Sequence, residues 1–207
     1  MNFAATSLLS LSEQEKLIDK LEIFTIKGRD KHGVTILQII GKFFPARTIT
    51  VEALNKYLAE KVYPRLAERP FSVVYVHTQV NRAENFPGLS RLRSIYEAIP
   101  NKVRDNLETV YFLHPGLQSR LFLAIFGSLL FGGGLYWKVK YVNRLDLLWD
   151  KVRRKEIEIP EFVYEHDKEL ENWPVMDYGL ESDHPRGHVS PPMLDSALQV
   201  YSMRCIA

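Results

Sequence analysis

Among the six histidines of this chain, two stand where a parallel sheet commonly places its ligands. His77 and His114 each follow a run of β-branched and aromatic residues that is typical of a strand. Two histidines at neighbouring strand ends could serve as a general acid and a general base. A histidine that is hydrogen-bonded between two layers of structure is the commoner arrangement, however. We therefore do not expect catalysis from this pair.

Sequence motifs for other common reactions of α/β proteins are absent. Ser128 follows Gly127 but lacks the second glycine of a G-x-S-x-G elbow, and it lies within an apolar run. The triple glycine 132–134 comes after this run, whereas a phosphate-binding loop would open a helix. No spacing typical of zinc ligands is present either. The sequence thus predicts no enzyme, no metal site and no resident cofactor other than a bound lipid.

The apolar run 121–131 is the most unusual stretch, because no charged residue lies between Arg120 and Lys138. A helix that is apolar all round must be covered by protein, membrane or ligand. Leaving half of it in water would cost several kcal/mol, at about 1.5–3 kcal/mol per large side chain. Each glycine of 132–134 costs roughly 1 kcal/mol inside a helix, so we expect the helix to end there at a hinge. We predict that this segment lines and gates a pocket for an apolar ligand, with core packing alone as the alternative.

Composition favours a cytoplasmic protein. The uncharged stretch Leu121–Trp137 is about 25 Å long as a helix, against roughly 30 Å of membrane hydrocarbon, so no membrane span is expected. The residues from Met1 to Ser12 lack the pattern of a secretory signal. Cys205 is the single cysteine, which excludes an intrachain disulfide and favours a reducing compartment. The net charge of +2 gives no indication of nucleic-acid binding.

Hydrophobic periodicity predicts alternating helices and strands. Ser12 and Glu15 have capping-box spacing, so a helix is expected from about Ser12 to Lys20. Strands are expected at 24–27, 34–40, 71–77, 109–113 and 138–142, and further helices at 51–65, from 89, at 121–131 and from 145. The first two strands should form a hairpin at a sheet edge. This order predicts an α/β fold with a mostly parallel sheet of about five strands, flanked by helices.

The chain divides into three predicted parts. Residues 1–21 form an N-terminal helical segment, and residues 22–167 form the layered domain. Residues 168–207 contain four prolines and an early acidic bias, which predicts a largely disordered or loosely attached tail.

Several short motifs occur in a familiar order. A turn at 30–33, a strand ending in His114-Pro115, the apolar helix, the run 138–143 (Lys-Val-Lys-Tyr-Val-Asn) and the closing Ile159-Pro160 follow one another. In this order they resemble the CRAL-TRIO lipid-binding domain, and in particular its divergent branch. That branch includes the BCH scaffolds and the modules that follow a macro domain in ganglioside-induced differentiation proteins. The resemblance covers roughly residues 22–167.

The resemblance implies a lipid cavity between the sheet and the apolar gate helix 121–131. In phosphoinositide-transfer relatives the lysine that opens the last strand contacts the headgroup phosphate, and Lys138 occupies that position. Those relatives carry Pro-Glu-Arg where this chain has Pro100-Asn101-Lys102, so phosphatidylinositol specificity is not implied. The hinge is expected at Gly132, Gly133 and Gly134. The residues expected at the lipid are Tyr111, Leu113, Leu121, Phe122, Ile125, Phe126, Leu129, Leu130, Phe131, Lys138 and Tyr141.

The expected function is therefore a non-catalytic, lipid-transfer-like module. Its ligand would be a phospholipid or a similar hydrophobic molecule, exchanged during transient, peripheral contact with a membrane surface. The alternative is a BCH-like scaffold that binds a small GTPase or another regulatory protein through basic groups. The basic residues considered for that role are Lys102, Arg104 and the cluster 151–155.

Overall fold

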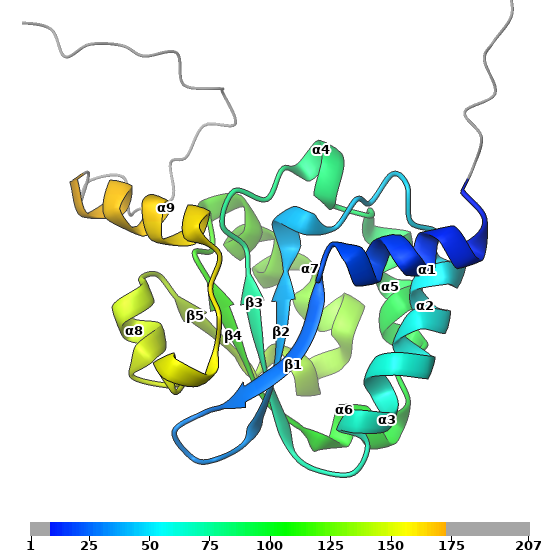
Figure 1. Cartoon of the computed structure of the whole chain (residues 1–207), viewed down its shortest axis with the longest axis horizontal. Coiled ribbons are helices and arrows are strands. Elements are labelled where there is room, and N and C mark those ends of the chain that lie inside the picture. The colour runs from blue at the N-terminus through cyan, green and yellow to red at the C-terminus, as the bar shows by residue number, and fades with distance from the viewer. Residues whose placement is uncertain (1–8, 173–207) are drawn as a thin grey trace, which may run out of the picture.

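A central five-stranded sheet organises the computed structural model, which describes residues 9–172 apart from the side chains of residues 128–133 and 172 (Figure 1). The strands occur in sheet order β1-β2-β3-β4-β5, and their bounds are β1 (Phe24–Arg29), β2 (Thr35–Ile40), β3 (Phe71–Val76), β4 (Leu107–Leu113) and β5 (Val139–Val142). β2 to β5 are parallel, and β1 is the antiparallel edge strand. The predicted α/β class, the edge hairpin and the mostly parallel sheet are confirmed.

The helices of the described region connect and cover these strands. Their bounds are α1 (Leu11–Lys20), α2 (Val51–Tyr57), α3 (Tyr63–Leu66), α4 (Arg82–Asn85), α5 (Leu89–Glu97), α6 (Asn101–Asn106), α7 (Leu117–Tyr136), α8 (Leu145–Trp149) and α9 (Glu161–Asn172), with the short turns η1 (Gly41–Phe43), η2 (Leu58–Val62) and η3 (Arg154–Glu156). The helix expected at 51–65 is present as the continuous run of α2, η2 and α3.

The predicted cap of the first helix is off by two residues. Ser10, and not Ser12, closes the capping box with Glu13, while Glu15 pairs with Lys56 at 2.7 Å. The earlier start lets the buried Gln14 accept a hydrogen bond from the Thr50 N–H at 2.8 Å. This long-range bond ties α1 to the start of α2. It favours the Ser10–Glu13 capping box over the Ser12–Glu15 pair, which has the same spacing in the sequence.

The β1–β2 turn is built on Asp30. Its Oδ1 accepts hydrogen bonds from the backbone N–H groups of His32 and Val34, both at 2.9 Å. Gly33 has φ +85°, a left-handed conformation that glycine adopts without steric cost. An isolated bridge between Asp30 and Val152 then fastens the turn to the segment after α8.

Side-chain alternation along the strands produces two cores, one on each face of the sheet. On one face Leu37 and Val73 pack with residues of α1, α2, α3 and α6. On the other face Val74 and Val76 pack with residues of α8 and α9. Because successive residues of a strand point to opposite faces, neighbouring positions belong to different cores. The same alternation determines which of the predicted site residues on the strands reach the cavity.

The helix α7 corrects one prediction about the glycines. We expected the helix to end before Gly132, but α7 continues through the triple glycine to Tyr136. Extending a helix that has already nucleated costs far less than starting one, so a penalty of roughly 1 kcal/mol per glycine does not stop it.

The axis of α7 is nevertheless bent. A Cβ atom added to Gly127 would lie 2.7 Å from Cδ2 of Tyr136, nine residues further on. In a straight helix these residues would be about 13.5 Å apart along the axis, at 1.5 Å per residue, which is beyond the reach of a tyrosine side chain. The bend therefore falls between Gly127 and Tyr136, in the part of the helix that contains Gly132–Gly134, and glycine and serine are frequent at helix kinks.

The last described helix also extends a predicted boundary. α9 runs to Asn172, so the first five residues of the expected tail, 168–172, belong to a regular helix. The remainder of that tail, residues 173–207, lies outside the described residues. Of the helices between residues 9 and 172, none combines the length and the apolar character that crossing a membrane requires.

Candidate ligand-binding site

A cavity of about 670 Å³ lies between the first face of the sheet and the helices α5 and α7. The sheet contributes Tyr75, Val110, Phe112 and Val139 to its wall, and Leu92 and Ile95 come from α5. The volume lies within the range of roughly 300–1,000 Å³ that is typical of small-molecule sites. A hollow of this size beneath the apolar helix is where the sequence predicted a ligand.

Three of the α7 residues expected at the lipid line this cavity: Phe122, Ile125 and Phe126. The ring of Phe122 packs against those of Phe126 and Phe86, each at a centroid distance of 5.5 Å. Leu121 is 52% exposed and is not part of the wall. The side chains of Leu129, Leu130 and Phe131 lie outside the described part of the chain, as does the burial of the hinge residues Gly132 and Gly133, while Gly134 is exposed.

Tyr111 and Leu113 do not reach the cavity, which corrects their expected position. Both are buried in the opposite core with Val74 and Val76. The residues of β4 that face the cavity are their neighbours Val110 and Phe112, as strand alternation requires. Tyr141 is likewise absent from the wall; it is 41% exposed and lies beneath the guanidinium group of Arg120.

Lys138 is also outside the cavity wall in this conformation. Its ammonium group donates a hydrogen bond at 2.5 Å to the carbonyl oxygen of Leu107, the first residue of β4. That position is at the amino-terminal edge of the parallel strands, whereas His77 and His114 lie at their carboxyl-terminal edge. A headgroup contact by Lys138 therefore remains a prediction.

The polar lining of the cavity comes mostly from the carboxyl ends of β3 and β4 and from the loops that follow. His77, Gln79, Arg82, Asn85 and Gln118 all contribute to it. The opposite part of the wall, around Val110, Val139, Leu123, Phe126 and Leu135, is apolar. The cavity is thus amphipathic, with its polar groups at the strand ends where α/β proteins commonly bind ligands.

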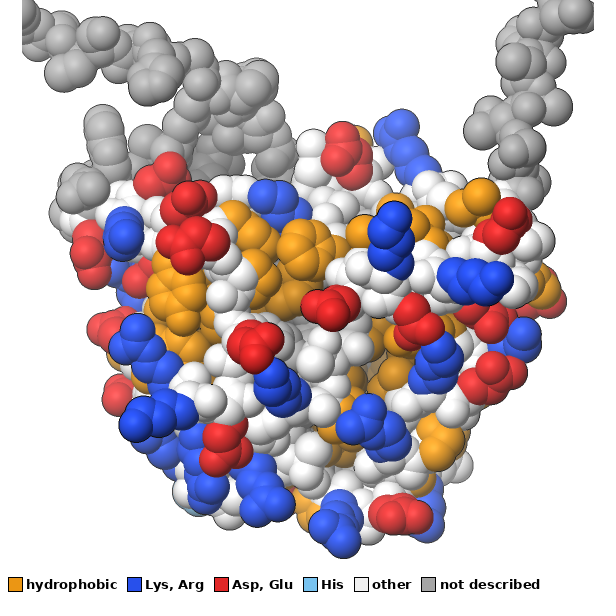
Figure 2. Space-filling model, viewed as in Figure 1, with side chains coloured by type: hydrophobic (Ala, Val, Ile, Leu, Met, Phe, Trp, Pro, Cys, Tyr) orange, Lys and Arg blue, Asp and Glu red, His pale blue; other side chains and the backbone are white. Residues whose placement is uncertain are grey.

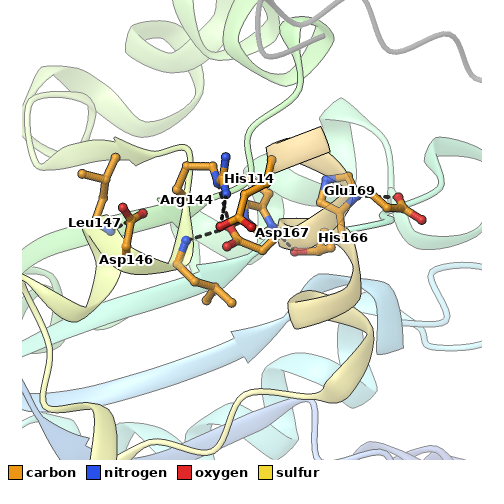
Figure 3. A network of polar contacts seen from close by, with 10 residues as sticks. His114, Arg144, Asp146, Leu147, His166, Asp167 and Glu169 are labelled. Atoms are coloured by element: carbon orange, nitrogen blue, oxygen red, sulfur yellow. Dashed lines mark hydrogen bonds and ion pairs between the residues drawn. The ribbon is translucent and has the colours of Figure 1, made fainter. Parts of the chain in front are cut away.

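His114 belongs to a hydrogen-bonded network that fastens α9 to the sheet (Figure 3). One carboxylate oxygen of Asp167 accepts hydrogen bonds from His114 Nε2 at 3.0 Å, Arg144 Nε at 3.2 Å and the Leu145 N–H at 2.9 Å. A carboxylate only accepts, so Nε2 carries the proton and Nδ1 accepts from the Thr78 hydroxyl, 2.8 Å away. The network also holds His114 at φ +51°, a conformation rarely adopted by a non-glycine residue.

Thr78, His114 and Asp167 have the connectivity of a nucleophile, a base and an orienting acid. His114 lines the cavity, but the residue in the place of the nucleophile does not reach it. Thr78 is 1% exposed and does not line the cavity. Burial lowers the pKa of His114 to about 4, although the hydrogen bond that Asp167 accepts from the ring opposes the shift. The His114 ring is neutral and hydrogen-bonded at both nitrogens, to Thr78 and to Asp167. Its role is therefore structural: it links the sheet to α9. Within the described residues no group of three His, Cys, Asp or Glu side chains could hold a metal ion.

The sequence did not indicate that α5, or the loop between α4 and α5, forms part of the cavity wall. Leu92 and Ile95 belong to the helix expected from residue 89, and their apolar side chains are equally typical of ordinary core packing. The available signal was Phe86-Pro87, an aromatic residue beside a proline in an otherwise polar loop. Both residues line the cavity.

The fold and the site together are a layered α/β sheet with an amphipathic cavity beneath an apolar helix. Residues 33–169 match the family described as divergent CRAL/TRIO domain, and the chain belongs to this family. The predicted family is therefore confirmed. Membership favours a non-enzymatic, lipid-binding type of module.

Curated relatives support the same assignment. The chain is 30% identical over 161 residues to ganglioside-induced differentiation-associated protein 2 of Xenopus tropicalis, covering 77% of this chain and 32% of that protein. It is 27% identical over 140 residues to a GDAP2 homolog of Drosophila melanogaster, covering 68% and 25% respectively. It is 28% identical over 158 residues to the Rho GTPase-activating protein gacY of Dictyostelium discoideum, covering 76% and 21%. The match thus spans only about a fifth to a third of the length of these relatives.

Proposed function

We propose that this domain is a non-catalytic module that holds a hydrophobic ligand in the cavity beneath α7. The observation that carries the proposal is the 670 Å³ hollow between an apolar part of the sheet and the helices α5 and α7. If a methylene takes the ~30 Å³ that a water molecule occupies in the liquid, the cavity holds about 20 such groups. That suffices for one long acyl chain, and a two-chain phospholipid requires α7 to move outward.

In this proposal α7 is the gate, with Gly132–Gly134 as its hinge. The exposed side chains of Leu121, and of Trp137 just after the helix, give it an apolar outer surface. A methylene gains roughly 0.8 kcal/mol on leaving water, whether it enters a bilayer or a cavity. A gate that lies in the membrane interface while open lets the ligand pass between two apolar environments without crossing water.

The direct test is to identify lipids bound to the protein recovered from cells and to measure lipid exchange between vesicles. Leu92→Trp places a larger side chain in the cavity and should reduce both bound lipid and exchange several-fold. Leu89→Trp makes the same change on the same helix at a residue that is 40% exposed and outside the wall, so both should be retained. A wild-type protein with no bound lipid and no exchange would refute the proposal.

A second candidate function is suggested by a basic surface that the sequence shows only in pieces. The Lys31 N–H donates to the Lys151 carbonyl oxygen at 2.8 Å, and the Arg153 N–H donates to the Arg29 carbonyl oxygen at 3.1 Å. These bonds join the β1–β2 hairpin to residues 151–155, and Figure 2 shows the Lys and Arg side chains gathered over this region at the lower left. We call this surface, formed by Arg29, Lys31 and the basic side chains of residues 151–155, the hairpin basic patch. Its positive charge is complementary to an acidic regulatory protein.

The relative gacY, whose name describes a Rho GTPase-activating protein, is a reason to consider a small GTPase as that partner. The double variant Arg29→Glu with Lys151→Glu should abolish capture of such a partner, whereas Lys102→Glu, on the separate helix α6, should not. Capture that survives reversal of the hairpin basic patch but is lost in Phe126→Asp would contradict the scaffold function and favour the cavity.

A further inference from the structure

His77 is a half-buried polar residue of the cavity wall with an unused ring nitrogen. It lines the cavity, and its Nδ1 is shielded from solvent without a hydrogen-bond partner in the described structure. The ring is held between two others, with centroid distances of 5.7 Å to Tyr75 and 5.0 Å to Phe112. Because Nδ1 is closed to the solvent and to an occupant of the cavity alike, only Nε2 of the ring is left to bond such an occupant.

The charge and tautomer of His77 limit what an occupant of the cavity can be. Burial lowers the pKa of His77 to about 4, so the ring is neutral at physiological pH. A buried N–H without a partner is costlier than an unpaired lone pair, which favours the proton on Nε2 and leaves Nδ1 as the empty acceptor. Nε2–H is then a hydrogen-bond donor for the occupant of the cavity.

Tyr75 provides a second donor beside His77. Its hydroxyl packs against Gly41, where an added Cβ would lie 2.6 Å from Oη, and it forms no hydrogen bond within the described part of the chain. Burial raises the pKa of Tyr75 to about 12, so the hydroxyl keeps its proton. Two neutral donors in one wall suit an oxygen acceptor that carries no charge.

The rest of the lining argues against an anionic headgroup at this position. Arg82 is the one charged residue among the described residues of the wall, and it is exposed on α4, beyond the end of β3. An anion placed between His77 and Tyr75 would be desolvated without a countercharge, at a cost far above that of a neutral group. The apolar part of the wall lies toward Val110 and Val139, where a hydrocarbon chain fits.

We infer that the cavity selects an amphiphile with an uncharged oxygen, an alcohol, ester or amide, that accepts hydrogen bonds from His77 and Tyr75 while its chain lies beneath α7. This inference rests on the proposed function and adds the class of headgroup. It assigns His77 as the specificity-determining residue of the cavity.

The test compares three ligands with the same twelve-carbon chain: dodecane, dodecan-1-ol and dodecanoate. Each displaces the fluorescent dye Nile red from the delipidated full chain. The His77→Phe variant keeps a ring between Tyr75 and Phe112 but removes both nitrogens. We expect the alcohol-to-alkane affinity ratio to fall about three- to tenfold in this variant, the usual effect of losing one neutral hydrogen bond.

Two further variants make the result specific. His77→Gln retains a donor and should keep most of the alcohol preference. His32→Phe makes the same change on an exposed residue of the β1–β2 turn and should behave as the wild type.

An unchanged ratio in His77→Phe would overturn the inference. So would tightest binding of dodecanoate that is weakened by Arg82→Gln, since Arg82 would then hold an anionic head. Failure of all three ligands to displace the dye would instead overturn the proposed function as well.

Discussion

At the scale of single residues, Asp167 shows how one carboxylate organises the polar edge of the molecule. Its oxygen accepts from His114, Arg144 and the Leu145 N–H, so it joins β4, the start of α8 and α9 (Figure 3). Arg144 reaches further and pairs with Glu171 at 2.9 Å. The nearby Asp146 only accepts from the N–H of its neighbour Leu147, and it is exposed.

We predict that Asp167→Ala lowers the free energy of unfolding by about 2–4 kcal/mol, because it leaves the buried His114 ring without an acceptor. Asp146→Ala is the matched control and should change the same quantity by less than about 1 kcal/mol. Urea denaturation of both variants measures the difference. Equal losses in the two variants would show that the network contributes little.

At the scale of elements, α7 combines a regular hydrogen-bonded backbone with a bend. Its two ends are anchored differently: Arg120 donates to Asn143 Oδ1 at 2.6 Å near the first turn, and the ring of Tyr136 packs on Gly127 near the last. Gly127 and Gly134 therefore have distinct roles. A Cβ on Gly127 would collide with Tyr136, whereas a Cβ on Gly134 would meet no atom within 4 Å.

We predict that Gly134→Ala raises the melting temperature by about 2–4 °C, because alanine favours a helix by about 1 kcal/mol over glycine. If the glycines form the hinge, the same variant should slow lipid exchange while leaving equilibrium binding nearly unchanged. Gly127→Ala should instead lower the melting temperature, since Tyr136 must move. Thermal denaturation and vesicle exchange measured on both variants test this; unaltered exchange in Gly134→Ala would contradict a hinge at that residue.

At the scale of the whole molecule, buried neutral histidines link stability to pH. Burial lowers the pKa of both His77 and His114 to about 4, against about 6.5 in an unfolded chain. Above pH 6.5 both rings are neutral in either state, and their contribution to stability is fully present. As the pH falls from about 6.5 to 4 the unfolded chain binds protons that the folded chain does not, so stability decreases.

We predict a loss of up to about 3 kcal/mol per histidine across this window, at about 1.4 kcal/mol per pKa unit. His77→Phe should remove its share, so the unfolding free energy of this variant should fall less steeply between pH 6.5 and 4 than that of the wild type. Carboxylates titrate in both proteins, and the comparison cancels their effect. Parallel curves for the two proteins would show that His77 is not buried in the neutral form.

Local sequence determined much of this fold. β-branched runs bounded by glycine, proline and polar residues identified the five strands, and an interior strand at 71–77 followed from its lack of a polar face. The apolar run 121–131 identified the element that covers the cavity, because a helix without a polar side must be buried or cover a ligand. These features depend on the order of residues along the chain, and the family resemblance rests on the same order.

Only the tertiary structure decided which side chains face the cavity and how the parts are joined. The sequence contains both Tyr111 and Phe112, and the face that each one occupies depends on the register of β4 against β3. The triple glycine did not show whether α7 ends or bends, since packing of Tyr136 on Gly127 outweighs a small local preference. The unpaired nitrogen of His77 and the hairpin basic patch arise from residues far apart in the chain, whose positions are set by long-range packing that local propensities do not encode.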